Sequence, residues 1–213
     1  AIPWGTVVPP IPPSRPDGDD ALTVLCVGRL GEHKGQAWLL DIYTRARLQV
    51  DRRVRLVLVG ADEGDAGGYD ALARRIKAHG LEGEVMLTGE VDDVELARLY
   101  GVADLFVLFS RYEAFGLVYV EAMAHGVPVL THDVGAVAEV LSSGAVIVPR
   151  YDAAAAVRAL GRLIGDDAAR RRLGAAARSM VEKAYSWDAV ATRYRRVYKE
   201  AIDERRRATG ATA

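Results

Sequence analysis

Six short apolar runs recur along this chain, and each is separated from the next by a segment long enough to form a helix. The runs are residues 22–27, 54–59, 85–87, 105–109, 127–130 and 145–148. Most of them lack the apolar–polar alternation of a strand with one face in water, so we expect strands buried on both faces. Strands that alternate with helices predict an α/β fold, a Rossmann-like doubly wound parallel sheet of about six strands with flanking helices.

Residues able to cap helices precede several of the helical segments. Asp92, Asp152, Asp166 and Ser186 each stand before apolar residues at helical spacing, and Glu95 completes a capping box with Asp92. The last segment predicts a helical tail with an aromatic stripe. From periodicity we expect this stripe to pack against the domain, although a stripe covered by another domain would look the same. It consists of Trp187, Val190, Ala191, Tyr194, Val197, Tyr198 and Ala201.

Residues 1–20 are rich in proline and end in the acidic cluster Asp17, Asp19 and Asp20. Proline removes backbone donors and favours extended conformations, so we interpret residues 1–20 as a linker and 21–213 as one domain. We interpret the acidic cluster as a solvated turn and not as a metal site. Because the chain opens inside this linker, we expect it to be a fragment of a longer protein.

Composition excludes several classes of protein. Lys+Arg 28 against Asp+Glu 29 argues against nucleic-acid binding, which needs a basic field. No apolar stretch approaches the ~20 residues of a membrane span, and no signal peptide is visible. The single cysteine, Cys26, lies in an apolar run and indicates a buried structural thiol. The four histidines show no metal-binding spacing, and we expect no metal.

A glycine-rich loop, Gly28-Arg29-Leu30-Gly31-Glu32-His33-Lys34-Gly35, follows the first run. Ligands of an open α/β sheet bind outside the carboxyl ends of its strands. The glycines permit close backbone approach, the loop leads into a helix N-terminus, and Arg29 and Lys34 add two cations. This suits a diphosphate, although surface charges beside a tight turn would give the same pattern. The spacing matches neither a P-loop nor the dinucleotide motif.

Two carboxylates, Glu113 and Glu121, stand eight positions apart around Phe115-Gly116-Leu117 after the fourth run. Eight helical residues span ~12 Å, which suits a ligand with a sugar, two phosphates and a ribose in line. Glu113 would meet the sugar hydroxyls, and the amides near Phe115, Gly116 and Leu117 would meet phosphate. Glu121 would accept from the ribose, since an ionised carboxylate among apolar residues needs partners.

The pattern Glu113-x7-Glu121, with Glu121-Ala122-Met123-Ala124-x-Gly126-x-Pro128 after it, resembles the signature of the GT-B retaining glycosyltransferases of family GT4. Gly28-Arg29-Leu30 with Lys34-Gly35 is similar to that family's phosphate loop. The resemblance extends from residue 22 to residue 202. It implies a nucleotide-sugar-binding, C-terminal half of a GT-B enzyme that transfers a hexosyl unit with retention, without a metal ion or other cofactor.

The resemblance also implies a role for each matching residue. Arg29 and Lys34 would neutralise the diphosphate of an NDP-sugar and stabilise the leaving nucleotide, Glu113 would orient the transferred sugar, and Glu121 would hold the ribose. The turn Gly89-Glu90-Val91 would meet the base through its backbone. The expected catalytic residues are Arg29, Lys34 and Glu113. The expected donor-binding residues are Gly28, Gly31, Val91, Phe115, Gly116, Leu117 and Glu121.

The resemblance further implies an N-terminal acceptor-binding domain that this chain lacks, so we expect the chain alone to be inactive. It implies a cytoplasmic protein, with any peripheral membrane contact made by the missing half. The sequence departs from the family at Trp4, where asparagine is usual, and at Val134-Gly135-Ala136, which lacks a second glycine and a proline. Two alternatives stay open: a non-catalytic nucleotide-binding module, and a GT-B-fold sugar-nucleotide epimerase. The complete set of Arg29, Lys34, Glu113 and Glu121 favours the transferase.

Overall fold

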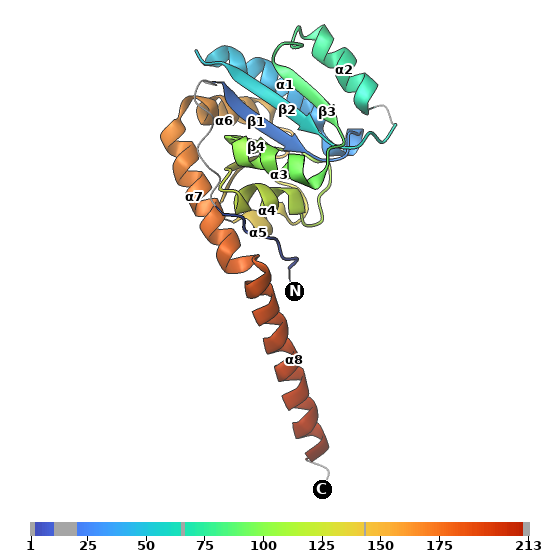
Figure 1. Cartoon of the computed structure of the whole chain (residues 1–213), viewed down its shortest axis with the longest axis vertical. Helices are drawn as coiled ribbons and strands as arrows, with labels where there is room; N and C mark the ends of the chain where they lie inside the picture. Colours follow the sequence, from blue (N-terminus) through green and yellow to red (C-terminus); the bar gives the residue numbers. More distant parts are fainter. Residues whose placement is uncertain (1–2, 11–20, 65–66, 143, 211–213) are drawn as a thin grey trace.

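The computed structural model describes residues 3–10, 21–64, 67–142 and 144–210. Six strands form one parallel sheet in the order β3-β2-β1-β4-β5-β6 (Figure 1). The α/β fold with six strands that the sequence predicts is therefore confirmed. The strands are β1 Leu22–Val27, β2 Val54–Val59, β3 Val85–Gly89, β4 Leu105–Val107, β5 Val129–His132 and β6 Ala145–Val148.

Helices cover both faces of the sheet. In Figure 1, α1 and α6 lie behind the sheet, and α3 and α4 lie in front of it. The chain first builds β1, β2 and β3 to one side and then returns to place β4 beside β1. The helices are α1 Gln36–Ala46, α2 Tyr69–Ala78, α3 Asp93–Val102, α4 Leu117–Ala124, α5 Val137–Leu141, α6 Ala153–Gly165, α7 Asp167–Ala184 and α8 Trp187–Gly210, with 3-10 turns η1 Glu32–Lys34 and η2 Arg47–Gln49.

The central strands lie in the core, as their unbroken apolar runs predict. Every residue of β1 is buried, whereas the edge strands β3 and β6 are partly exposed. Cys26 lies within β1, and burial raises the pKa of its thiol to about 12. The thiol is therefore protonated at neutral pH, which confirms a structural cysteine and not a nucleophile.

Side-chain caps begin several helices where the sequence predicts them. The side chains of Asp92, Asp152 and Asp166 each accept from the amide three residues ahead over 2.8 Å. Ser186 Oγ accepts from the amide three residues ahead over 3.2 Å. The Glu95 carboxylate pairs with Arg98 instead of completing the capping box. These caps satisfy amides that a helix leaves without internal partners.

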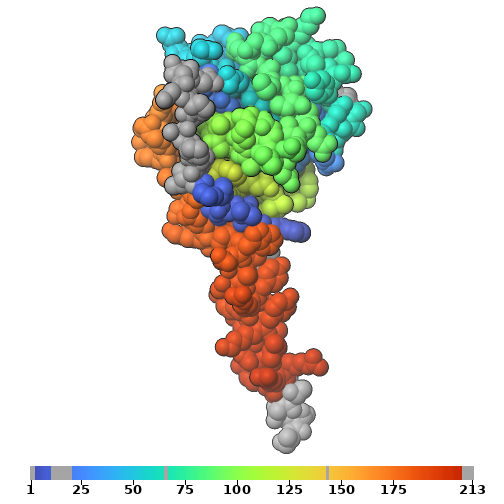
Figure 2. All heavy atoms as spheres, viewed as in Figure 1, coloured from blue at the N-terminus to red at the C-terminus, as the bar shows by residue number. Residues whose placement is uncertain are grey.

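The expectation that the stripe of α8 packs against the domain is wrong for most of its length. Val190 is buried, but the aromatic residues beyond it are largely exposed, with Tyr198 at 64%. Figure 1 and Figure 2 show why, since α8 leaves the body at the end of α7 and extends away from it. Periodicity predicted an apolar face correctly, but it carried no information about what that face meets.

Residues 3–10 run beside the end of α7. Thr6 N donates to Tyr185 O over 2.7 Å, and Arg178 donates to Pro9 O over 2.7 Å. The first part of the expected linker is therefore hydrogen-bonded to the domain. The acidic cluster at Asp17, Asp19 and Asp20 lies outside the described residues.

Candidate functional site

The loops that follow β1 and β4 meet at the carboxyl ends of these two adjacent strands. Arg111 N donates to His33 O over 2.7 Å, and the Arg111 side chain pairs with Glu32 over 3.0 Å. The strand order reverses between β1 and β4. Open α/β sheets bind their ligands at such a switch point, so the topology selects these two loops as the candidate site.

Two residues shape the glycine-rich loop. Gly35 adopts φ 71° between η1 and α1, and a Cβ there would lie 2.2 Å from Phe109 O. Gln36 is buried, and its side-chain amide donates to Gly28 O over 3.2 Å and to Arg29 O over 2.9 Å. Gln36 was not predicted as a site residue, because its only signal in the sequence was its place directly after the loop.

Lys34 and Glu113 pair inside the site. Lys34 Nζ donates to Glu113 Oε2 over 2.9 Å, and the two side chains are 17% and 13% exposed. Ser110 Oγ lies 3.4 Å from the same carboxylate oxygen. The structure thus brings together two predicted site residues that are 79 positions apart. Because both charges are largely shielded from water, each depends on the other for a partner.

Arg29 pairs with a different carboxylate. Its side chain is 65% exposed, and its guanidinium lies 2.5 Å from the Glu63 carboxylate, which also lies 2.9 Å from His33 Nδ1. The loops after β1 and β2 bring these groups together, with Leu30 N donating to Ala61 O over 2.8 Å. Arg29 therefore lies at the rim of the site, and Glu63 is a further charged residue that the motif analysis missed.

The residues between the two glutamates line a cavity of about 310 Å³. Gly116 precedes α4 in a left-handed conformation, φ 79°, and no side chain caps this helix. The amides of Leu117 and Val118 therefore precede the first internal bond, from Tyr119 N to Gly116 O, and the helix dipole is positive at this end. Phe115 packs edge-to-face on Tyr185, with ring centroids 5.7 Å apart. The cavity is lined by Trp4, Lys34, Glu113, Ala114, Phe115, Gly116, Leu117 and Val118.

Glu121 lies farther along α4 and has the partner that its apolar surroundings predict. The Tyr100 hydroxyl, from α3, donates to Glu121 Oε2 over 3.0 Å. Burial, reinforced by the Glu121 charge, raises the pKa of Tyr100 well above its usual value, so this hydroxyl keeps its proton. From sequence, Tyr100 was predicted only as part of a helix, and this contact was not foreseen.

The other predicted residues lie at the same edge of the sheet. Gly31 and Gly28 belong to the loop after β1, and Val91 follows β3, two strands away. Gly60 N donates to Gly89 O over 2.9 Å, which ties the turn before Val91 to the end of β2. Gly28, Gly31, Val91, Arg29 and Glu121 do not line the cavity that holds Lys34 and Glu113.

The turn that departs from the family pattern packs on Glu113. Ala136 N donates to Glu113 O over 3.4 Å, before the short helix α5 begins at Val137. The turn therefore supports the backbone of Glu113 even without the second glycine and the proline.

His132, at the end of β5, contacts the loop after β4 that carries Glu113. It is buried, and its Nε2 lies 2.7 Å from Ser110 O. Its Nδ1 is buried with no hydrogen-bond partner within the described part of the chain. Burial is the main cause that lowers the pKa of His132 below 6.5, and the positive charge of Arg150 also lowers it.

This pKa shift predicts loss of stability in weak acid. Below pH 6.5 the unfolded chain binds a proton at His132 that the folded chain resists, so the free energy of unfolding should fall between pH 7 and pH 5. Urea unfolding at several pH values would measure this slope. In His132→Asn, which keeps an amide donor for Ser110 O, the slope should be shallower. An unchanged slope in the variant would show that other groups cause the acid sensitivity.

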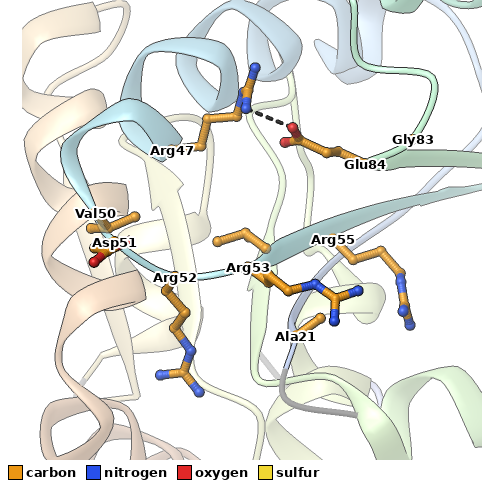
Figure 3. A pocket seen from close by; sticks show the side chains of 10 residues that line it. Ala21, Arg47, Val50, Asp51, Arg52, Arg53, Arg55, Gly83 and Glu84 are labelled. Carbon is orange, nitrogen blue, oxygen red and sulfur yellow. Dashed lines mark hydrogen bonds and ion pairs between the residues drawn. The ribbon is translucent and has the colours of Figure 1, made fainter.

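A second cavity, of about 670 Å³, lies at the opposite edge of the sheet, beside the amino ends of β1 and β2. Figure 3 shows four arginines around it, Arg47, Arg52, Arg53 and Arg55. Arg47 pairs with Glu84 over 2.6 Å, and Arg52 pairs with Asp167. The chain's own carboxylates thus already neutralise part of this charge, and neither predicted motif reaches this edge.

The described residues include neither a cluster suited to a metal ion nor a helix suited to a membrane. No three His, Cys, Asp or Glu side chains in this part of the chain are grouped so that they could hold a metal ion. None of its helices has both the length and the apolar character needed to cross a bilayer.

Comparison with known proteins places the chain in a family. The family model described as glycosyl transferases group 1 matches residues 10–180. The chain is 38% identical over 181 residues to the phosphatidyl-myo-inositol mannosyltransferase of Mycobacterium leprae, covering 83% of this chain and 46% of that protein. It thus spans about half the length of this curated relative.

Solved structures agree on the fold. A sucrose-phosphate synthase from Thermosynechococcus elongatus superposes with a TM-score of 0.72 and 31% identity, over 87% of this chain and 46% of that one. The Anabaena protein HepE, solved in complex with UDP-glucose, superposes with a TM-score of 0.73 over 85% of this chain and 49% of that one, at 24% identity. With these matches and the family model over most of its length, the chain belongs to the glycosyl transferases group 1 family.

Proposed function

We propose that this chain is the donor-binding half of a glycosyltransferase that moves a hexosyl unit from a nucleoside diphosphate sugar to an acceptor, with retention of configuration. The observation that carries this proposal is the shielded Lys34–Glu113 pair in one cavity with the uncapped N-terminus of α4. A cation, free amides and a carboxylate in one cavity match the phosphate and sugar ends of such a donor.

The diphosphate would lie between Lys34 and the first turn of α4. Lys34 supplies a full positive charge, and the amides of Leu117 and Val118 supply oriented donors. The N-terminus of α1, preceded by Gly35, also lacks a side-chain cap. Cations and helix dipoles of this kind stabilise the charge that builds on a departing nucleotide, so we propose transfer without a metal ion.

The two glutamates would bind the two ends of the donor. Glu113, at the cavity, accepts hydrogen bonds from hydroxyls of the transferred sugar. Glu121, held by the Tyr100 hydroxyl at 3.0 Å, accepts from the ribose. The backbone around Val91 would meet the base. Arg29, exposed and paired with Glu63, contributes less to the diphosphate than Lys34 does.

An N-terminal acceptor-binding domain would complete the enzyme. The chain spans about half of its relatives, and α8 exposes Tyr194, Val197 and Tyr198 at 43%, 44% and 64%. An apolar face of this kind is usually covered by a partner surface. We therefore propose that the missing half packs against part of α8, and that this chain alone binds donor without transferring sugar.

Calorimetric titration of the chain with UDP, GDP and ADP tests the binding step. We expect one nucleotide to bind, and we expect Arg29→Ala/Lys34→Ala to abolish this binding. The control variant Arg74→Ala/Lys77→Ala also removes one arginine and one lysine, but from the exposed face of α2, away from the site. It should leave nucleotide binding unchanged. Equal weakening of nucleotide binding in both double variants would indicate nonspecific electrostatic attraction and would contradict a specific binding site.

Product analysis on the full-length protein tests the reaction itself. With the matching nucleotide sugar and an acceptor, we expect a glycoside whose anomeric configuration equals that of the donor, as NMR can establish. Chelation of divalent cations should not slow the reaction. Inversion would refute the retaining mechanism. Release of an epimerised sugar nucleotide would show that the protein is an epimerase and not a transferase. Transfer by the present chain alone would refute the need for a second half.

A further inference from the structure

Trp4 lines the cavity that holds Lys34 and Glu113, although it lies more than 100 positions from Glu113 in sequence. Trp4 is 65% exposed, so much of its indole is accessible to a ligand in the cavity. No motif in the sequence analysis assigned it a role.

The backbone around Trp4 is anchored to the domain. Thr6 N donates to Tyr185 O over 2.7 Å, and Thr6 and Ser186 form a short parallel bridge. Gly5 packs directly on the Trp187 ring, where a Cβ would lie only 2.6 Å from a ring carbon. The cavity wall itself is joined to the same anchor, since Phe115 packs on Tyr185. The position of the indole beside the cavity therefore follows from the contacts of Gly5 and Thr6, the two residues directly after Trp4.

Two of the residues that line the cavity have complementary chemistry. Glu113 offers carboxylate oxygens, which accept from hydroxyl groups, and Trp4 offers a broad apolar ring. A pyranose has hydroxyls at its edge and C–H groups on its faces, so it can satisfy both at once. The cavity volume of about 310 Å³ accommodates one sugar ring.

We propose that Trp4 binds the sugar of the donor by packing its indole against the C–H face of the ring, while Glu113 accepts from the hydroxyls. This inference rests on the proposed donor site and assigns sugar binding to a residue at which the chain departs from the family pattern. Because a nucleoside diphosphate lacks the hexose, Trp4 contributes to the affinity for the nucleotide sugar and not to that for the nucleotide.

The test compares these two affinities in the chain by calorimetry. The probes are UDP with UDP-glucose, GDP with GDP-mannose, and ADP with ADP-glucose, and the pair whose nucleotide binds is used. In Trp4→Ala we expect about fivefold weaker binding of the nucleotide sugar and unchanged binding of the nucleotide. Trp4→Phe should restore most of the loss. Tyr198→Ala, which removes an aromatic ring of matching exposure from α8, should change neither affinity.

Indole fluorescence gives a second measurement. The chain has three tryptophans, Trp4, Trp38 and Trp187, and a sugar on Trp4 should change the emission in a way that the nucleotide alone does not. This difference should vanish in Trp4→Phe.

The outcomes separate the two proposals. One outcome is that the nucleotide binds while the ratio of the affinities for nucleotide sugar and nucleotide is the same in Trp4→Ala as in the unsubstituted chain. In that case the role of Trp4 is refuted while the donor site stands. Trp4 would then belong to the apolar surface that it forms with Trp187 and Tyr194. If no nucleotide or nucleotide sugar binds the unsubstituted chain, the donor site fails and the role of Trp4 is rejected with it.

Discussion

Replacing Lys34 by methionine is expected to weaken nucleoside diphosphate binding about a hundredfold, whereas Arg29→Ala should weaken it about fivefold or less. Lys34 is largely shielded, so its charge acts on a ligand with little screening by water. Arg29 is exposed and pairs with Glu63 at the rim. The sequence motif gives Arg29 and Lys34 the same role, and only their different burial in the structure distinguishes them. Calorimetric titration of each single variant measures the difference.

A double variant separates binding from folding. In Lys34→Met the Glu113 carboxylate, 13% exposed, loses its ion pair, so the melting temperature should fall. Lys34→Met/Glu113→Gln removes the unpaired charge and should recover most of the melting temperature without recovering nucleotide affinity. Recovery of both would show that Lys34 acts only by supporting the fold. Equal losses in the Arg29 and Lys34 single variants would contradict the assignment of the main phosphate contact to Lys34.

Gly35→Ala is expected to lower the free energy of unfolding by about 3 to 5 kcal/mol, although it adds only a single methyl group. Gly35 has φ 71°, which strains a residue with a Cβ. The added Cβ would also lie 2.2 Å from Phe109 O, so the loops after β1 and β4 would have to separate. The backbone oxygen cannot rotate away as a side chain would.

Gly80→Ala is the matched control. Gly80 has nearly the same backbone angle, φ 64°, but a Cβ there would meet nothing within 4 Å. This variant should lose only about 1 kcal/mol, the cost of the backbone conformation itself. Urea unfolding of both variants gives the comparison. Similar losses would mean that strain alone matters at Gly35 and that the approach of the two loops is not tightly specified.

Local patterns predicted the elements of this fold well, because burial on both faces and helix capping leave direct marks in the sequence. The buried run of β1 was predicted with its observed ends, and Asp152 and Asp166 cap the helices that they precede. The fourth run was too long, since the strand ends at Val107 and the chain turns toward the site. Apolar residues continue past that end because Leu108 and Phe109 remain buried outside the strand.

The residues of the site were predicted more completely than their contacts. Loop position placed Lys34 and Glu113 at one edge of the sheet, but their ion pair depends on two strands that become neighbours only in the folded sheet. Tyr100, the partner of Glu121, carried no signal, since an apolar position in a helix looks the same whether or not its hydroxyl reaches a carboxylate. Periodicity also did not reveal that most of the apolar face of α8 is exposed.

By itself the sequence determined the alternation of strands and helices, the family, and which residues stand at the carboxyl ends of the strands. Each of these depends on residues near one another along the chain or on motifs of fixed spacing. Only the tertiary structure decided that Lys34 is shielded while Arg29 is exposed, that α8 leaves the body, and that Trp4 borders the cavity of Glu113. The physical reason is that exposure and pairing depend on which distant segments pack together, and local spacing does not record that packing.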